Sequence, residues 1–351
     1  MGMQRIGGCL LQLTRALGSL PLVHWRSSSG INRLRFLSTQ ATESHTMEVI
    51  PGKTKMGWIG TGVMGVHMAR HCMDKGYGPF FVYNRTMQKA QALVEKGATV
   101  CKSPKELAQH CDVVFTMVGY PHDVRQVILD QSSGVLAGLK KGGVVIDLTT
   151  SEPSLAKEIA EVASSQGKYS LDAPVTGGDV GAKNGTLVVF VGGSQSAYES
   201  VSPLLSCFGK TIKYFGEAGS GQHAKLANQI TIASNMIGMC EGLIYAYKAG
   251  LNLETYLSAV LSGGAASFSL QAYSPRIMKR DMAPGFYVEH FVKDLGIALA
   301  ECQRMRISLP GLALAQQLYV SLMANGGAKK GTQALIETLE LLNGCQLPKM
   351  S

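Results

Sequence analysis

Apolar residues follow two different patterns along the chain. Between residues 55 and 216, short apolar runs rich in β-branched and aromatic residues alternate with stretches of helical periodicity. The runs predict buried strands at Met56–Ile59, Phe80–Tyr83, Val113–Met117, Val144–Leu148 and Tyr169–Leu171, with Thr186–Val191 and Ile212–Phe215 extending the sheet. The intervening stretches predict helices near Gly65–Lys75, Gln88–Lys96, Asp123–Leu129 and Ser154–Ser165. Such alternation is typical of a doubly wound parallel sheet with helices on both faces.

The strand pattern stops after Gly219. A long helix is predicted from Ser220 to about Ala249. After Gly221 this stretch contains no proline, and its two glycines, Gly238 and Gly242, lie within an apolar pattern. Further helices are predicted near Leu253–Leu261, Val292–Met305, Leu312–Met323 and Thr332–Leu342. The sequence therefore predicts an α/β domain over residues 55–217 and an all-helical domain over residues 218–346, joined by a long interdomain helix.

The first 45 residues have the composition of a targeting segment. Residues 1–42 contain no acid and no lysine, but five arginines and several serines. That composition is typical of an organelle transit peptide, and the stretch Arg33–Ser38 resembles a mitochondrial processing site. We therefore expect residues 1–45 to direct the chain to the mitochondrial matrix, with a plastid as the alternative.

Charge and cysteine content exclude several other classes of protein. The formal net charge of +9 comes mostly from the first segment, and the rest has 28 basic and 24 acidic residues, so no nucleic-acid partner is expected. The eight cysteines form no CxxC pair, so we expect reduced thiols and no metal site. The uncharged stretch Leu226–Cys240 is too short to span a bilayer, and Thr255–Pro275 contains five serines, so no membrane partner is expected.

A glycine-rich turn follows the first predicted strand. The residues Gly60, Thr61, Gly62, Val63, Met64 and Gly65 form a GxGxxG motif between that strand and the next helix. In this context the first glycine permits the tight turn, the second lets the backbone approach a pyrophosphate, and the third allows close helix packing. The phosphate charge would lie at the helix N-terminus. The motif predicts a Rossmann-type domain that binds a dinucleotide.

The second predicted strand ends without an acid. An acidic residue there would bind the ribose 2′-hydroxyl and favour NAD. This chain has Asn84, Arg85 and Thr86, which suit a 2′-phosphate. We therefore expect NADP(H) to be favoured, with NAD(H) as the alternative if Arg85 is only a solvated loop residue.

Three motifs together resemble the β-hydroxyacid dehydrogenase family, and the resemblance covers residues 55–345. The first runs from Trp58 through the glycine turn, the second is Asp172-Ala-Pro-Val-Thr-Gly-Gly178, and the third is Gly219-Ser-Gly-Gln-His-Ala-Lys-Leu-Ala-Asn-Gln229. A late Lys293-Asp-Leu also matches. The chain departs from the family pattern at four places that do not remove a reacting group, namely Thr61, His71, Val118-Gly119 and Thr176.

The resemblance implies a role for each matching residue. Lys225 would be the general acid and base, because a buried lysine beside a cofactor can have its pKa lowered towards neutrality. Asn228 and Gln229 lie at i+3 and i+4 on the same helix face and would hold the substrate oxygen or the lysine. The substrate carboxylate would bind at Thr176, Gly177 and Gly178. The remaining cofactor contacts implied are Val118, Gly119, Thr150 and Lys293.

These residues predict an NAD(P)-dependent oxidoreductase that interconverts a short β-hydroxy acid, such as 3-hydroxyisobutyrate, and its semialdehyde. The expected partner is a small carboxylate-bearing substrate, and the long apolar helix suggests a homodimer or homotetramer. One alternative is an NADPH-dependent reductase of succinic semialdehyde, glyoxylate or tartronate semialdehyde. Another is a catalytically inactive, cofactor-sensing scaffold, which the presence of Lys225 and Asn228 disfavours.

Overall fold

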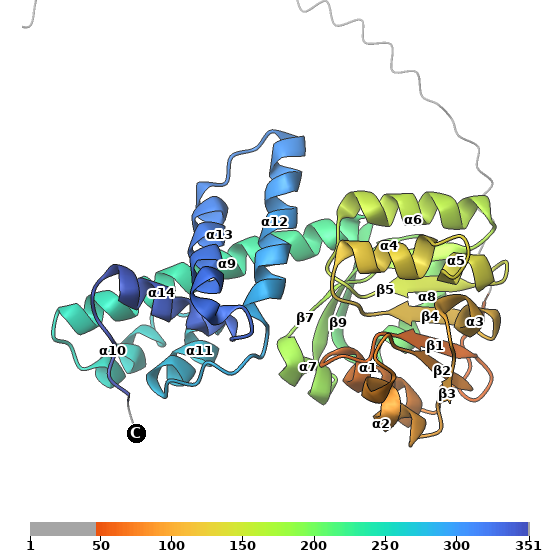
Figure 1. Ribbon diagram of the computed structural model, residues 1–351, viewed down its shortest axis with the longest axis horizontal. Coiled ribbons are helices and arrows are strands. Elements are labelled where there is room, and N and C mark those ends of the chain that lie inside the picture. The colour runs from red at the N-terminus through yellow and green to blue at the C-terminus, as the bar shows by residue number, and fades with distance from the viewer. Residues whose placement is uncertain (1–46, 350–351) are drawn as a thin grey trace, which may run out of the picture. The chain divides into compact units, whose positions relative to one another are not determined.

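The computed structural model describes residues 47–349, and the predicted targeting segment at residues 1–45 lies outside them. The described residues belong to a single compact unit. Within the described part, a nine-stranded sheet with its helices is followed by helices alone (Figure 1). The strands are β1 (Met56–Ile59), β2 (Phe80–Tyr83), β3 (Thr99–Val100), β4 (Val113–Thr116), β5 (Val144–Asp147), β6 (Tyr169–Asp172), β7 (Val175–Thr176), β8 (Leu187–Gly193) and β9 (Gly209–Gly216).

The sheet is doubly wound. Its strand order is β3-β2-β1-β4-β5-β6-β8-β7, with β9 paired to β8. All pairs from β3 to β6 are parallel, with Met56 opposite Phe80 on one side and Val113 on the other. The order reverses at β1, so the loops after β1 and β4 open a crevice where ligands bind in such sheets. The predicted doubly wound sheet is confirmed, although β8 runs antiparallel to β6 and β7.

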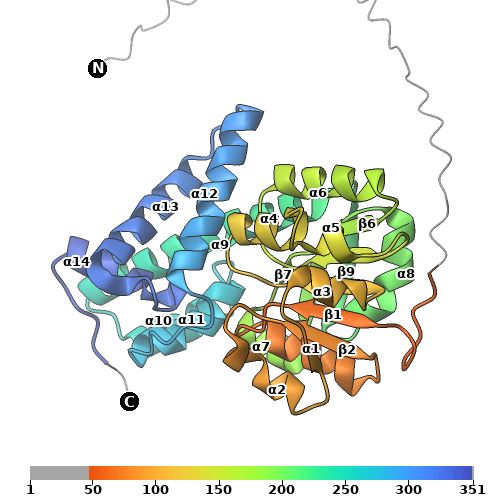
Figure 2. The same ribbon diagram turned by 45° about the vertical axis from the view of Figure 1, so that its right-hand side comes forward.

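Alternating side chains of each central strand enter different cores. Trp58 packs with Phe115 and Phe208 in one core, whereas Ile59 packs on the opposite face with Val114. On the Trp58 face lie α1 (Gly65–Asp74), η1 (Met87–Ala90), α2 (Gln91–Val94), α7 (Gly178–Asn184) and α8 (Gln195–Leu205). On the Ile59 face lie α3 (Pro104–Gln109), α4 (Pro121–Leu129), α5 (Val135–Gly138) and α6 (Pro153–Ser165), seen in Figure 2.

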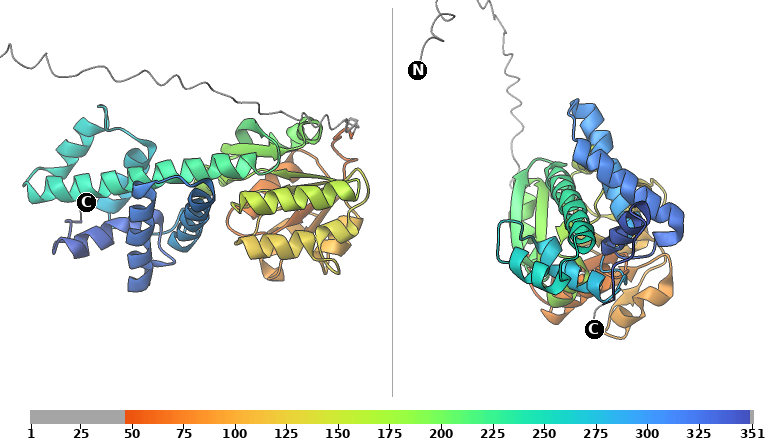
Figure 3. Two further views of the ribbon diagram at one scale, coloured as in Figure 1. Left: turned by 90° about the horizontal axis from the view of Figure 1, so that it is seen from above. Right: turned by 90° about the vertical axis from the view of Figure 1, so that its left-hand side faces the viewer.

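The long helix α9 (Ser220–Lys248) spans 29 residues and contacts both parts of this unit. It begins beside β8 and continues through the remaining helices (Figure 3). Because helices surround it, its buried positions lie on more than one face, which accounts for its apolar sequence. The other helical segments are α10 (Leu253–Val260), α11 (Phe268–Met278), α12 (Val288–Met305), α13 (Pro310–Leu322), η2 (Met323–Gly327), η3 (Thr332–Ala334) and α14 (Leu335–Leu342).

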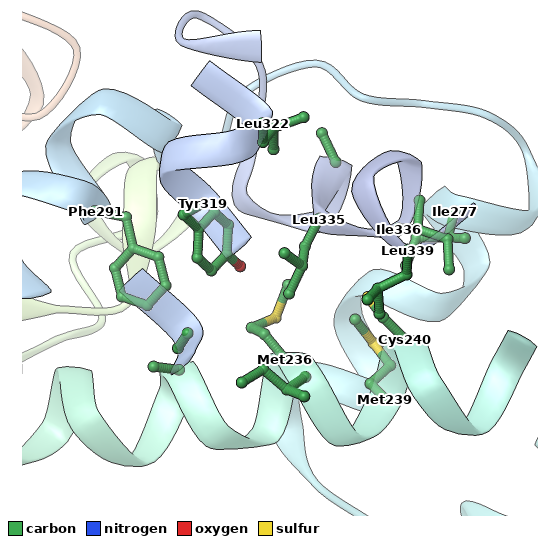
Figure 4. Packing of buried hydrophobic residues seen from close by; sticks show 14 of the residues in the cluster. Met236, Met239, Cys240, Ile277, Phe291, Tyr319, Leu322, Leu335, Ile336 and Leu339 are labelled. Atoms are coloured by element: carbon green, nitrogen blue, oxygen red, sulfur yellow. The ribbon is translucent and has the colours of Figure 1, made fainter. Parts of the chain in front are cut away.

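The helical part has its own hydrophobic core around α9. Met236, Met239 and Cys240 of α9 face residues of α12, α13 and α14 (Figure 4). The buried Tyr319 packs edge-on against Phe291 and donates its hydroxyl hydrogen to a backbone carbonyl of residue 332 at 2.9 Å. None of the helices within residues 47–349 combines the length and hydrophobicity that crossing a bilayer requires.

Several elements differ from the sequence predictions. The short strands β3 and β7 and the helices α3, α5, α7, α8 and α11 were not predicted, although Ser103, Pro104 and Glu106 mark the start of α3 in the sequence. The predicted helix near Gln88–Lys96 is divided into η1 and α2. Helix α12 begins at Val288, four residues before the predicted start, because the apolar spacing continues upstream of Val292. Helix α11 contains Pro275, which disfavoured a helix there.

Candidate active site

The glycine turn is held by close backbone packing. Gly60 has a φ of +92°, and a Cβ there would lie 2.1 Å from the carbonyl oxygen of Met117. A Cβ on Gly65 would lie 2.1 Å from the carbonyl oxygen of Gly60. The indole of Trp58 donates to that same oxygen at 3.1 Å. Glycine is therefore required at both positions by the fold itself.

The middle of the turn has a different requirement. A Cβ on Gly62 would meet no protein atom within 4 Å, so protein packing does not explain the glycine. The neighbouring Thr61 hydroxyl is buried without a hydrogen-bond partner, and the Val63 residue is 51% exposed. Helix α1 begins at Gly65, after Met64 at its N-terminal boundary, so its first amides point towards the turn. These features fit the pyrophosphate of a dinucleotide.

The end of β2 contributes one residue to the turn and one to its rim. The Asn84 side chain accepts a hydrogen bond from the Thr61 amide at 2.9 Å and donates to the Thr86 carbonyl at 2.6 Å. Its amide therefore supports the loop. The Arg85 side chain is 84% exposed and forms an ion pair with Asp123 at 3.2 Å.

Lys225 lies in the first third of α9, and only 6% of its surface is exposed. Burial lowers its pKa to about 8, the positive charge of Lys293 acts in the same direction, and the negative charge of Asp294 opposes both. Near pH 8, Lys225 is therefore a neutral amine in a substantial fraction of the molecules and an ammonium in the rest. The side chain can consequently both donate and accept a proton.

A chain of polar contacts begins one turn after this lysine on α9 and leads to Asp294, whose charge acts on the lysine. Asn228 donates to the Thr176 hydroxyl at 3.5 Å and to the Gln229 side-chain oxygen at 2.9 Å. Gln229 in turn donates to Asp294 Oδ2 at 2.6 Å. Through these amides, residues of α9 connect the end of β7 with α12.

Lys293 completes the connection to the sheet. Its ammonium lies 2.9 Å from Asp294 Oδ1 as an ion pair, although the angle does not make a hydrogen bond. The same ammonium donates to the Thr150 carbonyl at 2.5 Å. The sequence-predicted residues Lys225, Asn228, Gln229, Lys293, Thr150 and Thr176 are thus brought into one neighbourhood.

The predicted carboxylate loop is the junction between β7 and α7. Thr176 ends β7, and Gly177 and Gly178 have φ values of +130° and +66°. A Cβ on Gly177 would lie 3.1 Å from a Leu187 methyl group, so space there is tight. Thr176 is thus followed by a tight turn, a conformation in which backbone amides and a hydroxyl can together bind an anion.

Two buried carboxylates support this part of the molecule: Asp172 holds the start of α9 against β6, and Asp147 joins β4 to the loop after β5. Asp172 accepts hydrogen bonds from the Gly219 and Gln222 amides, each at 2.8 Å. Asp147 accepts from the Thr116 hydroxyl at 2.7 Å and the Thr149 amide at 3.1 Å. Burial raises the pKa of each carboxyl to about 6, although the hydrogen bonds to each carboxylate lower it. They belong to the framework beneath the lysine.

The side chain of Gln222 links this framework to the loop after β5. It donates to the Thr149 carbonyl at 2.8 Å and accepts from the Ser151 amide at 2.8 Å. The Thr149 hydroxyl accepts from the Val118 amide at 3.0 Å, which orients the loop after β4. A Cβ on the next residue, Gly119, would lie 3.3 Å from Asp123 Oδ2.

Sequence reasoning assigned no role to Asp147, Asp172, Gln222 or Asp123. Asp147 and Asp172 each end an otherwise mostly apolar strand, which is a signal of a buried polar contact at the carboxyl edge of the sheet. Gln222 lies one turn before Lys225 on the same helix face. The pairing of Asp123 with Arg85 has no local signal. Among residues 47–349, no group of three or more His, Cys, Asp and Glu side chains is arranged to hold a metal ion.

Comparison with known proteins matches both parts of the chain. A family model described as the NAD binding domain of 6-phosphogluconate dehydrogenase matches residues 55–216. A second, described as NAD-binding of NADP-dependent 3-hydroxyisobutyrate dehydrogenase, matches residues 219–339. A relative from Arabidopsis thaliana, "Probable 3-hydroxyisobutyrate dehydrogenase-like 1, mitochondrial", is 54% identical over 92% of this chain and 97% of its own length. The chain belongs to the β-hydroxyacid dehydrogenase family.

Further similarities agree with this assignment. The 2-hydroxy-3-oxopropionate reductase of Escherichia coli is 34% identical over 82% of this chain and 98% of its own length. The structure of a Mycobacterium tuberculosis 3-hydroxyisobutyrate dehydrogenase with L-serine superposes with a TM-score of 0.75 and 28% identity, covering 82% of this chain and 99% of that one. The predicted fold class and the predicted NAD(P)-dependent oxidoreductase function are confirmed at the level of the family, which disfavours the inactive scaffold.

Proposed function

We propose that this member of the family interconverts a short β-hydroxy acid and its semialdehyde, with 3-hydroxyisobutyrate as the first candidate substrate. The observation that carries the proposal is the buried ammonium of Lys225, whose pKa is lowered to about 8 by burial. Lys225 lies one turn before Asn228 on α9, and the Asn228 side chain donates a hydrogen bond to Thr176 at the start of the proposed carboxylate loop. One proton-transfer group and one anion-binding group are what reduction of a carboxylate-bearing aldehyde requires of the protein.

A nicotinamide dinucleotide supplies or accepts the hydride when it is bound. In the direction of reduction, the Lys225 ammonium donates a proton to the carbonyl oxygen while the carbonyl carbon receives the hydride. In the direction of oxidation, the neutral amine of Lys225 accepts the hydroxyl proton. Asp294 and Lys293 act on the lysine with opposite charges, and the Gln229 amide fixes Asp294 in place at 2.6 Å.

The substrate carboxylate is assigned to the backbone amides around Gly177 and Gly178 and to the hydroxyl of Thr176. This hydroxyl already accepts a hydrogen bond from Asn228 at 3.5 Å. Asn228 thereby couples the carboxylate end of the substrate to the helix that carries Lys225. Substrates that lack a carboxylate would leave these donors without an acceptor, and this disfavours them.

For the cofactor, we propose that NADP(H) is favoured over NAD(H). The support is the guanidinium of Arg85 at the end of β2, where many NAD-binding domains have an acid. The turn from Gly60 to Gly65 would bind the pyrophosphate. Val118, Gly119, Thr150 and Lys293 would lie along the nicotinamide half.

A second substrate candidate is supported by a specific similarity. The Escherichia coli relative is named 2-hydroxy-3-oxopropionate reductase, and tartronate semialdehyde is that same aldehyde. The physiological reaction would then be NADPH-dependent reduction, with succinic semialdehyde and glyoxylate as related substrates. The Lys225–Gln229 stretch resembles such reductases.

The relative from Arabidopsis thaliana is named mitochondrial. Together with the arginine-bearing, acid-free composition of residues 1–42, this supports import into the mitochondrial matrix, with a plastid as the alternative. We further infer a homodimer or homotetramer from the family resemblance. Import of a fluorescent fusion and sedimentation of the purified chain test these two inferences.

The experiment that tests the function measures initial rates of the full chain with four substrates. These are 3-hydroxyisobutyrate, tartronate semialdehyde, succinic semialdehyde and glyoxylate, each with NAD(H) and NADP(H). We expect kcat/KM to be highest for 3-hydroxyisobutyrate and higher with the phosphorylated cofactor. A higher value for tartronate semialdehyde would select the second candidate, and turnover of none of the four would contradict the proposed substrate class.

A further inference from the structure

The Arg85 guanidinium has a partner of opposite charge. Its Nη1 lies 3.2 Å from Asp123 Oδ1, and the two residues are 38 positions apart in the sequence. The arginine side chain is 84% exposed, whereas the aspartate side chain is 12% exposed. The aspartate is therefore the fixed member of the pair, and the guanidinium is the one that is free to turn towards a ligand.

Asp123 is fixed by its position in the first turn of α4. Helix α4 begins at Pro121, so the carboxylate of Asp123 lies near the positive end of the helix, where an anion is stabilised. Its Oδ2 packs against the backbone of Gly119, because a Cβ on that glycine would be only 3.3 Å away. His122 Nε2 lies 3.7 Å from Oδ1.

The sheet topology places this pair at the nucleotide end of the crevice. Strand β1 lies between β2 and β4, so the glycine turn after β1 is flanked by the loop carrying Arg85 and the loop leading to Asp123. In this type of domain, the group at the end of β2 meets the ribose 2′ position. A 2′-phosphate that binds Arg85 must therefore compete with Asp123 for the guanidinium.

We propose that Asp123 is a specificity-determining residue that reduces discrimination in favour of NADP(H). Its carboxylate neutralises the guanidinium that a 2′-phosphate requires, and it repels that phosphate directly. NADH carries no charge at this position, so its binding is affected much less. This proposal rests on the proposed dinucleotide site and deepens it, because it assigns the selectivity to a pair of residues from two loops.

The test measures dissociation constants for NADPH and NADH by calorimetry with the full chain, without substrate. For Asp123→Asn, we expect NADPH binding to tighten about tenfold, because the guanidinium loses its competing partner and the phosphate no longer faces a carboxylate, while NADH binding changes less than threefold. In an Arg85→Ala background, the gain for NADPH should fall to about threefold, because only the direct repulsion of the phosphate by Asp123 is then removed. Raising the ionic strength should reduce the tenfold gain, since the arginine is exposed.

Glu158→Gln is the matched control. Glu158 lies on α6 and pairs at 2.5 Å with Arg125, which is on α4 like Asp123. The variant therefore removes one negative charge from an ion pair with α4 and leaves the loop after β2 unchanged. It should leave the ratio of the two dissociation constants unchanged. Asp123→Ser serves as a second variant, and a thermal melt of each variant checks that it is folded.

The outcomes separate this inference from the function on which it rests. If both dinucleotides bind but their ratio stays within twofold in Asp123→Asn and Asp123→Ser, the role of Asp123 is wrong and the dinucleotide site remains. An equal effect of Glu158→Gln would assign the change to net charge and would also overturn the inference. If the unmodified chain binds neither dinucleotide, the proposed cofactor site and the role of Asp123 are both overturned.

Discussion

The proposed site pairs a cation with an aspartate at its nucleotide end and again at its lysine end, but the environments of the two pairs differ. At the nucleotide end, the Arg85 side chain is 84% exposed next to Asp123. At the lysine end, Lys225 and Lys293 lie beside Asp294, whose side chain is only 1% exposed. Water screens the charges of Arg85 and Asp123, so this pair can exchange its partners. The buried charges of Lys225, Lys293 and Asp294 are screened much less, so they interact more strongly with one another.

This contrast indicates different tasks for similar residues. An exposed ion pair contributes only about 1 kcal/mol or less, so the arginine can exchange its aspartate for a ligand at a cost of a few-fold in affinity. A buried lysine cannot be fully charged without a penalty, and its pKa moves towards the pH at which it works. Selectivity between cofactors is thus expected at the exposed end, and proton transfer at the buried end.

The largest effect is expected from a substitution at the buried lysine. Lys225→Ala removes the proposed general acid, so kcat should fall about 10²–10⁴-fold while the dissociation constant for the dinucleotide changes less than threefold. Steady-state kinetics and calorimetry measure the two quantities. Lys248→Ala, an exposed lysine at the last position of the same helix, is the matched control and should retain full activity. Activity of Lys225→Ala within tenfold of the unmodified chain would contradict the mechanism.

A smaller effect is expected for the framework that holds the lysine. Asp172→Ala leaves the Gly219 and Gln222 amides without their acceptor in a buried position. Unpaired buried donors cost about 2–4 kcal/mol in total, so the free energy of unfolding should fall by that amount, as urea denaturation would show.

The control for this variant comes from the exposed end. Asp123→Asn disrupts a pair with a solvent-exposed arginine and should change the free energy of unfolding by less than about 1 kcal/mol. Equal destabilisation by Asp123→Asn and Asp172→Ala would remove the distinction between a buried structural carboxylate and an exchangeable one.

The sequence predicted most of the fold because its strongest signals are local. Each central strand is a continuous apolar run, and the glycine turn joins the first of them to a helix. The elements that were missed are short or break a local rule. Strand β3 has two residues, α7 is glycine-containing, and α11 includes a proline, so their structure depends on tertiary packing.

The site was predictable to a different extent at its two ends. The spacing of Lys225, Asn228 and Gln229 places them on one helix face, and resemblance to a family added their roles. Those roles stay predictions until the variants are measured. The contacts that set the lysine's surroundings join residues far apart in sequence, such as Gln229 with Asp294 across 65 positions. No local pattern predicts such a partner, and the same holds for Arg85 and Asp123.

The smallest expected effect is a change in kcat/KM of about tenfold per pH unit, and it tests the pKa of Lys225. A lysine with a pKa of about 8 is an ammonium below that pH and an amine above it. The kcat/KM for reduction should therefore be constant below pH 8 and fall about tenfold per unit above it, because the proton donor is lost. The kcat/KM for oxidation should rise towards pH 8 and then level off. Initial rates between pH 7 and 10 measure both profiles.

The lower limit of that range keeps the framework carboxylates out of the titration. Burial raises the pKa of Asp147 and Asp172 to about 6, so the free energy of unfolding falls as the pH rises through 6 and both carboxyls ionise. At pH 7 this ionisation is largely complete. A break near pH 8 therefore reports on the lysine. Lys225→Arg supplies the control, since a guanidinium stays protonated over the whole range and its residual reduction rate should have no break there. If the break persists in this variant, another group carries the proton, and the contrast between the exposed and buried ends no longer explains the chemistry.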